Sequence, residues 1–317
     1  TKTGTGTLTL SNGANDFAGI VTVSGGELSV DTLANGGQAS GIGAGVSDPA
    51  GLVLQGGGSL QYTGATTSTD RGFTLAGGQG RVDVATAATT LAIGGTVVGQ
   101  GALYKDADGP LVLTGTNTYT GGNTVTAGTL RAGSGQAFGG AANGTGAGPM
   151  TVAAGATLDL DDNSVFVGGL YGAGSVTLGT GTLQVNNGGT FTGAISGTGG
   201  VTTTRGVQAM NGCGNAYTGV TRISGSAIST DCLADGGQAS GIGAAASDPA
   251  NLVLANGTLQ YTGGDVDTAD VRGLAGEAEV GLHRALDAQD LLEEVGDLLP
   301  VLAELVLEIG VLRQVLE

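Results

Sequence analysis

The chain of 317 residues has no tryptophan, and its aromatic residues are limited to 5 phenylalanines and 6 tyrosines. A wide globular core is usually built around such side chains. Their scarcity favours a narrow core lined by Val, Leu, Ile, Ala and Thr, as in stacked coils. Proline is also scarce, at 5 residues, and the 66 glycines do not recur at every third position. These two facts exclude collagen.

Positively charged residues are also few: the chain has 10 basic and 27 acidic residues, and its net charge is −17. Nucleic acid and anionic lipid both require a basic surface, so neither is an expected partner. Charged residues total 12% and apolar residues 40%, which is the reverse of a disordered chain. We find no signal-peptide pattern and no apolar run of membrane-spanning length. The chain opens without an initiator Met, and we expect it to be a piece of a longer protein.

Internal repeats are the main positive feature. Residues 15–28, 117–130 and 215–228 share a pattern of Asn, one residue, an aromatic, Thr or Ala, Gly and a short β-like run. A longer match joins residues 36–50 to residues 236–250, with thirteen identities in fifteen positions. This match indicates duplication of a unit of about 200 residues, itself built from smaller coils.

Short runs of alternating polarity, such as Thr157-Leu158-Asp159-Leu160, fill the sequence between these matches. Runs of period two between Gly, Asn and Asp clusters predict strands with tight corners. No helical period occurs before residue 270, and no propeller blade signature is present. The sequence therefore predicts an all-β parallel solenoid over residues 1–264, with about a dozen coils of about 20 residues each.

Several of these runs resemble bacterial autotransporter passengers. Residues 148–160 resemble their "TV-x-AGATLDL" element, and residues 193–203 resemble their "G-x-ISGTGGLTKTG" element. The opening residues 1–10 resemble the continuation of that second element, which places Thr1 in mid-repeat. The run at 117–130 is similar to the autotransporter-associated β-strand repeat. The resemblance implies a right-handed parallel β-helix that reaches the surface of a Gram-negative cell through a C-terminal outer-membrane barrel. That barrel is missing here, and residues 204–212 depart from the Gly-rich β pattern.

Candidate catalytic residues are few. The single histidine, His283, lies outside the repeats, so residues 1–264 hold no base for a Ser-His-Asp or Cys-His system. Asp159, Asp161 and Asp162 are clustered, and paired carboxylates can divide acid and base roles. They end a β-like run before Asn163, a composition typical of a turn. We therefore assign no catalytic residue.

Metal and cofactor motifs are also weak. Asp106-Ala107-Asp108-Gly109 resembles the start of a calcium loop, but Asn117 stands at the twelfth position, where an EF-hand requires Glu. Loose GxGxxG matches are expected by chance among 66 glycines, and no strand-then-helix context accompanies them. We assign neither a metal ligand nor a cofactor.

The two cysteines, Cys213 and Cys232, are separated along the sequence by close to one coil length. Stacked positions in neighbouring coils bring Cα atoms to about 5.5 Å, which suits a disulfide. A disulfide and a pair of buried thiols both remain open at this point. If the chain is exported, we expect the pair to be oxidised.

Two further sets of residues recur with the repeats. Phe17, Tyr119 and Tyr217 occupy one repeat position, where either a core corner or sugar stacking is open, and we expect the core. The duplicated segments at 36–50 and 236–250 are the longest irregular stretches. Loops on a rigid solenoid are where binding resides, so they are the candidate partner surface beside the alternative of a duplicated spacer.

Residues 265–317 form a second region by composition, with 13 acidic and 3 basic residues and only 5 glycines. Apolar residues fall at a 4-3-4-3 spacing from Leu291 to Leu316, which predicts a short helical segment interrupted at Gly296, Pro300 and Gly310. Three accounts stay open: a cap on the solenoid, a dimerisation helix, or out-of-frame sequence.

The function hypothesis that follows is a structural and adhesive passenger that is not an enzyme. Expected partners are a host-cell surface, a polysaccharide, or like passengers through self-association. The alternative is a β-helical polysaccharide lyase or hydrolase. That alternative needs a cleft with clustered charges, whereas the 14 acidic and 7 basic residues of 1–264 are scattered.

Overall fold

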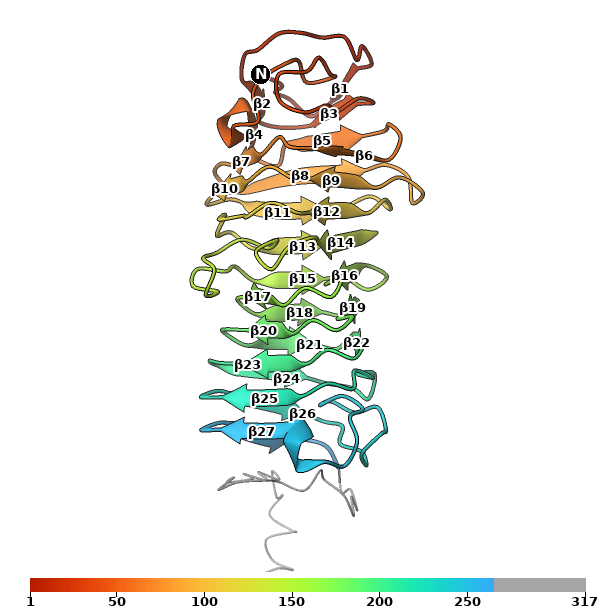
Figure 1. Ribbon diagram of the computed structural model, residues 1–317, viewed down its shortest axis with the longest axis vertical. Coiled ribbons are helices and arrows are strands. Elements are labelled where there is room, and N and C mark those ends of the chain that lie inside the picture. Colours follow the sequence, from red (N-terminus) through yellow and green to blue (C-terminus); the bar gives the residue numbers. More distant parts are fainter. Residues whose placement is uncertain (265–317) are drawn as a thin grey trace, which may run out of the picture. The chain divides into compact units, whose positions relative to one another are not determined.

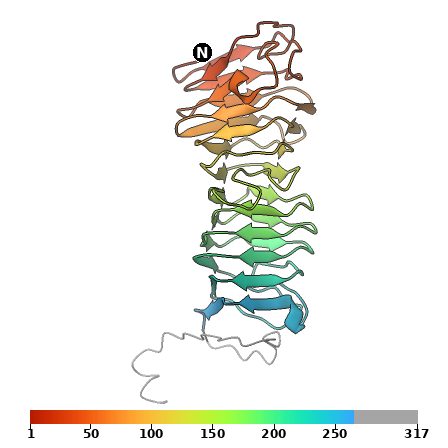
Figure 2. The same ribbon diagram turned by 60° about the vertical axis from the view of Figure 1, so that its left-hand side comes forward.

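A computed structural model describes residues 1–264, which form stacked coils of short strands (Figure 1). Strands of successive coils lie one above another in both views (Figure 2). Apart from two one-turn 3-10 helices, η1 (Pro49–Gly51) and η2 (Pro249–Asn251), all regular elements here are strands. No helix in this part of the chain is long and apolar enough to span a membrane. The helical segment predicted within 265–317 and its boundary at residue 264 lie outside the described residues.

Four sheets run along the stack. The 12-stranded sheet contains β1 (Thr7–Leu10), β3 (Glu27–Val30), β5 (Ser59–Tyr62), β8 (Gln79–Val84), β11 (Ala102–Lys105), β13 (Asn123–Val125), β15 (Met150–Val152), β18 (Leu170–Gly172), β21 (Gly189–Phe191), β24 (Val207–Met210), β26 (Ala227–Thr230) and β28 (Thr258–Tyr261). The 7-stranded sheet contains β6 (Thr67–Thr69), β9 (Leu91–Ile93), β12 (Leu111–Leu113), β14 (Thr129–Ala132), β16 (Thr157–Asp159), β19 (Ser175–Thr177) and β22 (Ala194–Ser196).

The third side of the stack is divided between two smaller sheets. The 4-stranded sheet contains β2 (Val21–Val23), β4 (Leu52–Leu54), β7 (Phe73–Leu75) and β10 (Val97–Gly99). The 5-stranded sheet contains β17 (Val165–Val167), β20 (Leu183–Val185), β23 (Val201–Thr203), β25 (Thr221–Ser224) and β27 (Leu252–Ala255). A coil such as β7, β8 and β9 therefore visits three sheets in turn before the next coil begins.

Every strand pairing within residues 1–264 is parallel. The predicted parallel solenoid is confirmed, with about 11 turns. A typical coil runs from Tyr104 to its register partner Thr124. The two coils that carry the duplicated segments 36–50 and 236–250 are more than half as long again. In these coils Glu27 pairs with Ser59, and Ser229 pairs with Gln260.

Alternation of polarity along each short strand determines which side chains face the core. In β12 the outer residues of Leu-Val-Leu are buried while the central Val112 is half-buried. The inward positions stack in register from coil to coil. One such row on the 7-stranded sheet consists of Leu91, Leu111, Leu130, Leu158, Val176 and Ile195, which have zero or almost no exposed surface. The narrow aliphatic core inferred from the scarcity of aromatics is this set of rows.

Residues 204–212, which depart from the repeat pattern, nevertheless contribute strand β24 to the 12-stranded sheet. Gln208 of this strand points inward and is fully buried. Its amide accepts a hydrogen bond from the Leu170 backbone N–H at 3.3 Å and donates to the Leu170 carbonyl at 3.1 Å. The pairing between β18 and β21 is reduced to Gly172 and Phe191. A core amide therefore satisfies backbone groups at the place where the sheet pairing is weakest.

The stacked core predicts a large difference between two leucine substitutions. Leu158→Ala removes a side chain with no exposed surface, and we expect it to lower the free energy of unfolding by about 2–5 kcal/mol. Leu8→Ala is the matched control, because Leu8 is 43% exposed, and we expect a change below about 0.5 kcal/mol. Urea unfolding followed by circular dichroism measures both. Equal losses at the two positions would contradict the inward assignment of Leu158.

Candidate binding surface

Three aromatic residues each hold the loop of the following coil. The carbonyl oxygens of Phe17, Tyr119 and Tyr217 accept hydrogen bonds from the backbone N–H groups of Ala44, Gly140 and Ala244, at 2.8, 3.0 and 2.7 Å. The residue before each donor is a glycine with positive φ, at 78°, 82° and 86° for Gly43, Gly139 and Gly243. A Cβ there would collide with the same aromatic residue. The loops at 31–51, 133–149 and 231–251 are therefore equivalent, and the middle one is not apparent from sequence similarity.

The asparagine of the repeat pattern clamps neighbouring coils together. Asn117 is fully buried, accepts a hydrogen bond from the Val97 N–H at 2.7 Å and donates to the Ala137 carbonyl at 2.7 Å. Asn215 accepts from the Ile195 N–H at 3.0 Å and donates to the Gly241 carbonyl at 3.3 Å. One side chain thus links the preceding coil to the following loop. This role accounts for the asparagine two residues before the aromatic in the second and third modules.

The expectation of a core position is confirmed for Tyr119 and Tyr217, which have no exposed surface. The Tyr119 hydroxyl donates to Asn123 Oδ1 at 2.5 Å, and the Tyr217 hydroxyl lies 2.7 Å from Thr221 Oγ1. The same expectation is wrong for Phe17, whose side chain is 44% exposed. Phe17 lies in the first described coil, so no described coil covers its outer side.

The three modules do not share one side of the stack. Strands β2 and β25, which follow Phe17 and Tyr217, belong to the 4-stranded and 5-stranded sheets. Strand β13, which follows Tyr119, belongs to the 12-stranded sheet instead. The middle module is therefore displaced around the coil by one sheet. Figure 1 shows the consequence, with the yellow-green loop 133–149 and the cyan loop 231–251 on opposite sides of the view.

The two duplicated loops share an internal bonding pattern. Ser40 and Ser240 donate from Oγ to the carbonyls of Gly43 and Gly243, at 2.8 and 2.7 Å. Asp48 and Asp248 accept from the N–H groups of Ala50 and Ala250, which begins each 3-10 helix. These bonds make both loops ordered elements, consistent with either a binding surface or a duplicated spacer.

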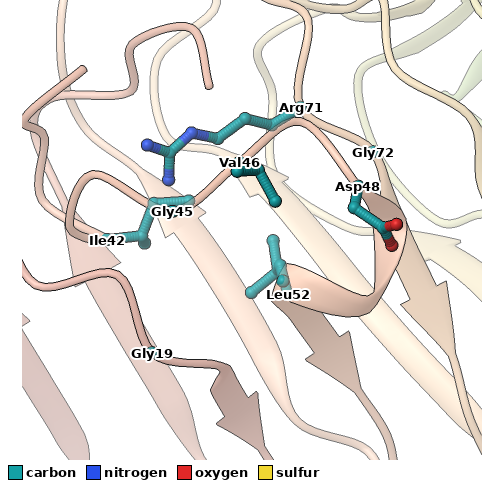
Figure 3. A pocket seen from close by; sticks show the side chains of 9 residues that line it. Gly19, Ile42, Gly45, Val46, Asp48, Leu52, Arg71 and Gly72 are labelled. Atoms are coloured by element: carbon teal, nitrogen blue, oxygen red, sulfur yellow. The ribbon is translucent and has the colours of Figure 1, made fainter. Parts of the chain in front are cut away.

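Arg71 anchors the first loop from the next coil (Figure 3). Its guanidinium donates to the carbonyls of Gln38 and Gly43 at 3.0 and 2.8 Å, and the residue is buried. The hollow beside it, lined by Ile42, Val46 and Leu52 among others, leaves space for about one water molecule. Arg71 Nε is buried without a partner among the described residues, and a bound water would satisfy it. The hollow is too small for a ligand.

The acidic cluster at 159–162 lies in a turn. Asp159 pairs with Arg131 at 2.8 Å across neighbouring strands. Asp161 and Asp162 have φ of 47° and 65°, and Asp162 accepts a hydrogen bond from the Thr180 N–H at 2.8 Å. The carboxylates of Asp159 and Asp162 are committed to coil contacts, and Asp161 takes part in the turn through its backbone N–H and carbonyl, as the sequence interpretation expected.

Asp106 is likewise engaged by protein groups. Its carboxylate pairs with Arg81 and accepts a hydrogen bond from Thr126, while its backbone N–H donates to Asp83 at 3.1 Å. Arg81 also lies over the Tyr104 ring, 5.0 Å from its centroid. Within residues 1–264 no three His, Cys, Asp or Glu side chains gather in a way that could hold a metal ion.

The sequence of this solenoid is similar to known protein sequences. A family model described as the passenger-associated-transport-repeat matches residues 1–30 and 108–132, which contain the Phe17 and Tyr119 modules. The adhesin BmaC autotransporter of Brucella suis biovar 1 (strain 1330) is 51% identical over 295 residues. The chain belongs to the autotransporter passengers. The matched region is 92% of this chain and 8% of that relative, and no solved structure matches the chain.

The passenger also holds a buried charge that its sequence did not reveal. Lys105 has no exposed surface and points inward from β11, where Nζ donates to the carbonyls of Ala107 and Ala127. Burial lowers its pKa to about 8, although Asp83 and Asp108 act in the opposite direction. Asp83 is 8% exposed and accepts a hydrogen bond from Ser59 at 2.6 Å. Burial raises the pKa of Asp83.

Cys213 and Cys232 are joined by a disulfide in the structure, with their Cα atoms 5.4 Å apart. In the first copy of the duplicated unit the equivalent residues are Gly13 and Thr32. A Cβ added at Gly13 would lie 3.4 Å from the Thr32 Cβ. That separation is close to the value of about 3.8 Å usual for disulfides. The first copy therefore has disulfide geometry without the cysteines.

The Lys105 environment predicts a pH dependence of stability. Because its folded-state pKa of about 8 lies below the ordinary lysine value of 10.5, the unfolded passenger binds more protons between these values. The free energy of unfolding should therefore rise as the pH increases from about 8 to about 10. Urea titrations at intervals of half a pH unit measure this rise. Lys105→Met should remove it, and a rise that persists unchanged in this variant would assign it to another group.

The cysteine pair predicts that a second disulfide can be built. The double variant Gly13→Cys/Thr32→Cys should oxidise spontaneously and stabilise the first coils by about 3 kcal/mol, as expected for a loop of this size. Intact mass after alkylation without reductant reports the number of free thiols. The single variant Gly13→Cys is the control and should take up one alkyl group. If both new thiols alkylate while Cys213 and Cys232 do not, the two copies are not geometrically equivalent.

Proposed function

We propose that this chain is an adhesive segment of a passenger displayed at the surface of a Gram-negative bacterium. The carrying observation is 51% identity, over 92% of the chain, to a protein named as an autotransporter adhesin. The chain spans about 8% of that relative, whose name describes the whole protein, so adhesion by this segment is a proposal. We further propose that the solenoid is right-handed, as the passenger resemblance and the usual hand of parallel crossovers favour.

The outer face of the 12-stranded sheet supports a contact role. One register row contains Tyr104, Thr124, Thr151 and Tyr171, which places two hydroxyl side chains between two aromatic ones along four neighbouring strands. Tyr171 is 41% exposed. Aromatic rings and hydroxyls at fixed spacing suit contact with a host-cell surface, a polysaccharide, or a second passenger.

We also propose that the segment has no catalytic activity. Asp106, Asp159 and Asp162 all accept hydrogen bonds or pair with arginine, and none faces an open cleft with a second carboxylate. No observation favours the polysaccharide-degrading alternative. We likewise propose that Cys213 and Cys232 are oxidised in the exported protein, because the bond joins neighbouring coils in an oxidising compartment.

Adhesion is tested with microspheres that carry the purified chain. We expect them to bind cultured epithelial cells several-fold more than microspheres carrying an unrelated protein of the same net charge, and free chain should compete. The same chain unfolded by heat before coupling is the second control, because the proposed contact surface exists only in the stacked coils. Binding no higher than that of either control would contradict an adhesive role for this segment.

A further inference from the structure

A polar groove lies where the middle loop meets the 5-stranded sheet. It has a volume of about 320 Å³, within the range typical of small-ligand sites. Its lining consists of amide, hydroxyl and guanidinium side chains together with one glycine: Asn143, Gly144, Thr145, Gln184, Asn186, Thr204, Arg205 and Ser224. None of these residues takes part in the hydrogen bonds between the three loops and the carbonyls of Phe17, Tyr119 and Tyr217.

Asn186 fixes the floor of the groove and is only 8% exposed. Its Nδ2 donates to the Gly144 carbonyl at 3.1 Å, which holds the loop tip against the sheet. Its Oδ1 accepts from Gln184 Nε2 at 3.0 Å and from Thr204 Oγ1 at 2.9 Å. The loop tip also lies on Phe166, since a Cβ at Gly144 would approach that ring to 2.6 Å. The groove is therefore preformed and needs no rearrangement to present its polar groups.

Two outward rows of the 5-stranded sheet continue the same surface. One row runs through Gln184, Thr202 and Arg222, which are register partners on β20, β23 and β25. The second row lies just beyond the first along the strands and contains Asn186, Thr204 and Ser224. Gln184 Oε1 and Ser224 Oγ have no hydrogen-bond partner among the described residues, so they are available to a ligand.

The charge of this surface is opposite to that of the whole chain. No acidic residue occurs between Asp162 and Asp231, whereas the chain carries 27 in total. Arg205 and Arg222 are both exposed, and neither forms an ion pair within the described residues. An arginine without a carboxylate partner, beside fixed amides and hydroxyls, is suited to bind a planar anion through paired N–H donors.

We propose that this groove binds a short acidic saccharide, with the carboxylate at Arg205 and ring hydroxyls at Gln184, Thr204 and Ser224. Amides and hydroxyls in fixed positions match the alternating donors and acceptors of sugar hydroxyls. A single carboxylate exploits the local positive charge, whereas a long polyanion would be repelled by the net charge of −17. The inference rests on the proposed adhesive function, because it takes the saccharide to be a ligand through which the segment adheres.

Isothermal calorimetry with the full chain tests the proposal, using 3′-sialyllactose, a hyaluronan tetrasaccharide and neutral lactose as probes. At least one acidic probe should bind about tenfold more tightly than lactose, because only it can form the charge-assisted pair with Arg205. The stronger acidic probe then identifies the source as a sialylated glycan or a uronic acid chain. Absence of binding by both acidic probes, or equal binding of lactose, overturns the proposal.

Variants locate the binding. Arg205→Gln should weaken the acidic probe about tenfold and leave lactose unaffected, since it removes only the charged contact. Arg131→Gln is the matched control, because it removes the same charge from the 7-stranded sheet, and the affinity should stay unchanged. A single cooperative thermal transition shows that each variant is folded, and a small shift is expected for Arg131→Gln because it removes the pair with Asp159. Equal effects of the two substitutions would refute the groove as the site.

Failure of this proposal is separable from failure of the proposed function. Chain-coated microspheres that bind cells, combined with no saccharide binding in solution, overturn the groove and leave adhesion standing. Saccharide binding that depends on Arg205, combined with microspheres that do not bind cells, supports the groove and contradicts adhesion.

Discussion

Backbone hydrogen bonding between successive coils is the interaction on which the rest of this passenger depends. Each strand gives its N–H and C=O groups to the coil before it and the coil after it, always in parallel register. The neighbours of a side chain are therefore its register partners in the coil before it and the coil after it. Rows of Leu, Val and Ile inside, and rows of Thr, Tyr, Gln and Arg outside, follow from that one constraint.

The same constraint determines where the chain can tolerate insertions. Extra residues must leave the stack at a corner and return in register, as the loops at 31–51, 133–149 and 231–251 do. The carbonyls of Phe17, Tyr119 and Tyr217 anchor those loops to coils that are already stacked. Buried asparagines add a second anchor for the loops at 133–149 and 231–251. Loops fixed in this way keep a defined position without a globular core, and the middle one forms a wall of the polar groove.

Local sequence pattern was sufficient to predict the solenoid, because period-two runs between glycine corners have few other solutions. It also predicted the burial of Tyr119 and Tyr217 from their repeat position. Phe17 shares that position and is half exposed, because burial depends on a covering coil that repeat alignment does not show.

Contacts between coils could not be predicted from the sequence for a related reason. The Lys105 environment and the Arg205 groove join residues from different coils, and the coils differ in length. A shift of one residue reverses the face of a side chain. Without the register, neither the inward direction of Lys105 nor the alignment of Gln184, Thr202 and Arg222 can be derived from the sequence.

The most direct test of this account is a pair of distances along one outward row of the 12-stranded sheet. Thr7, Thr124 and Ser229 occupy the same row, with five strand steps between each neighbouring pair. Spin labels at Thr7 and Thr124, and at Thr7 and Ser229, should give electron–electron distances near about 24 Å and about 48 Å at the usual strand spacing of about 4.8 Å. A second distance that is about twice the first supports a continuous parallel stack. A second distance equal to or shorter than the first would contradict it.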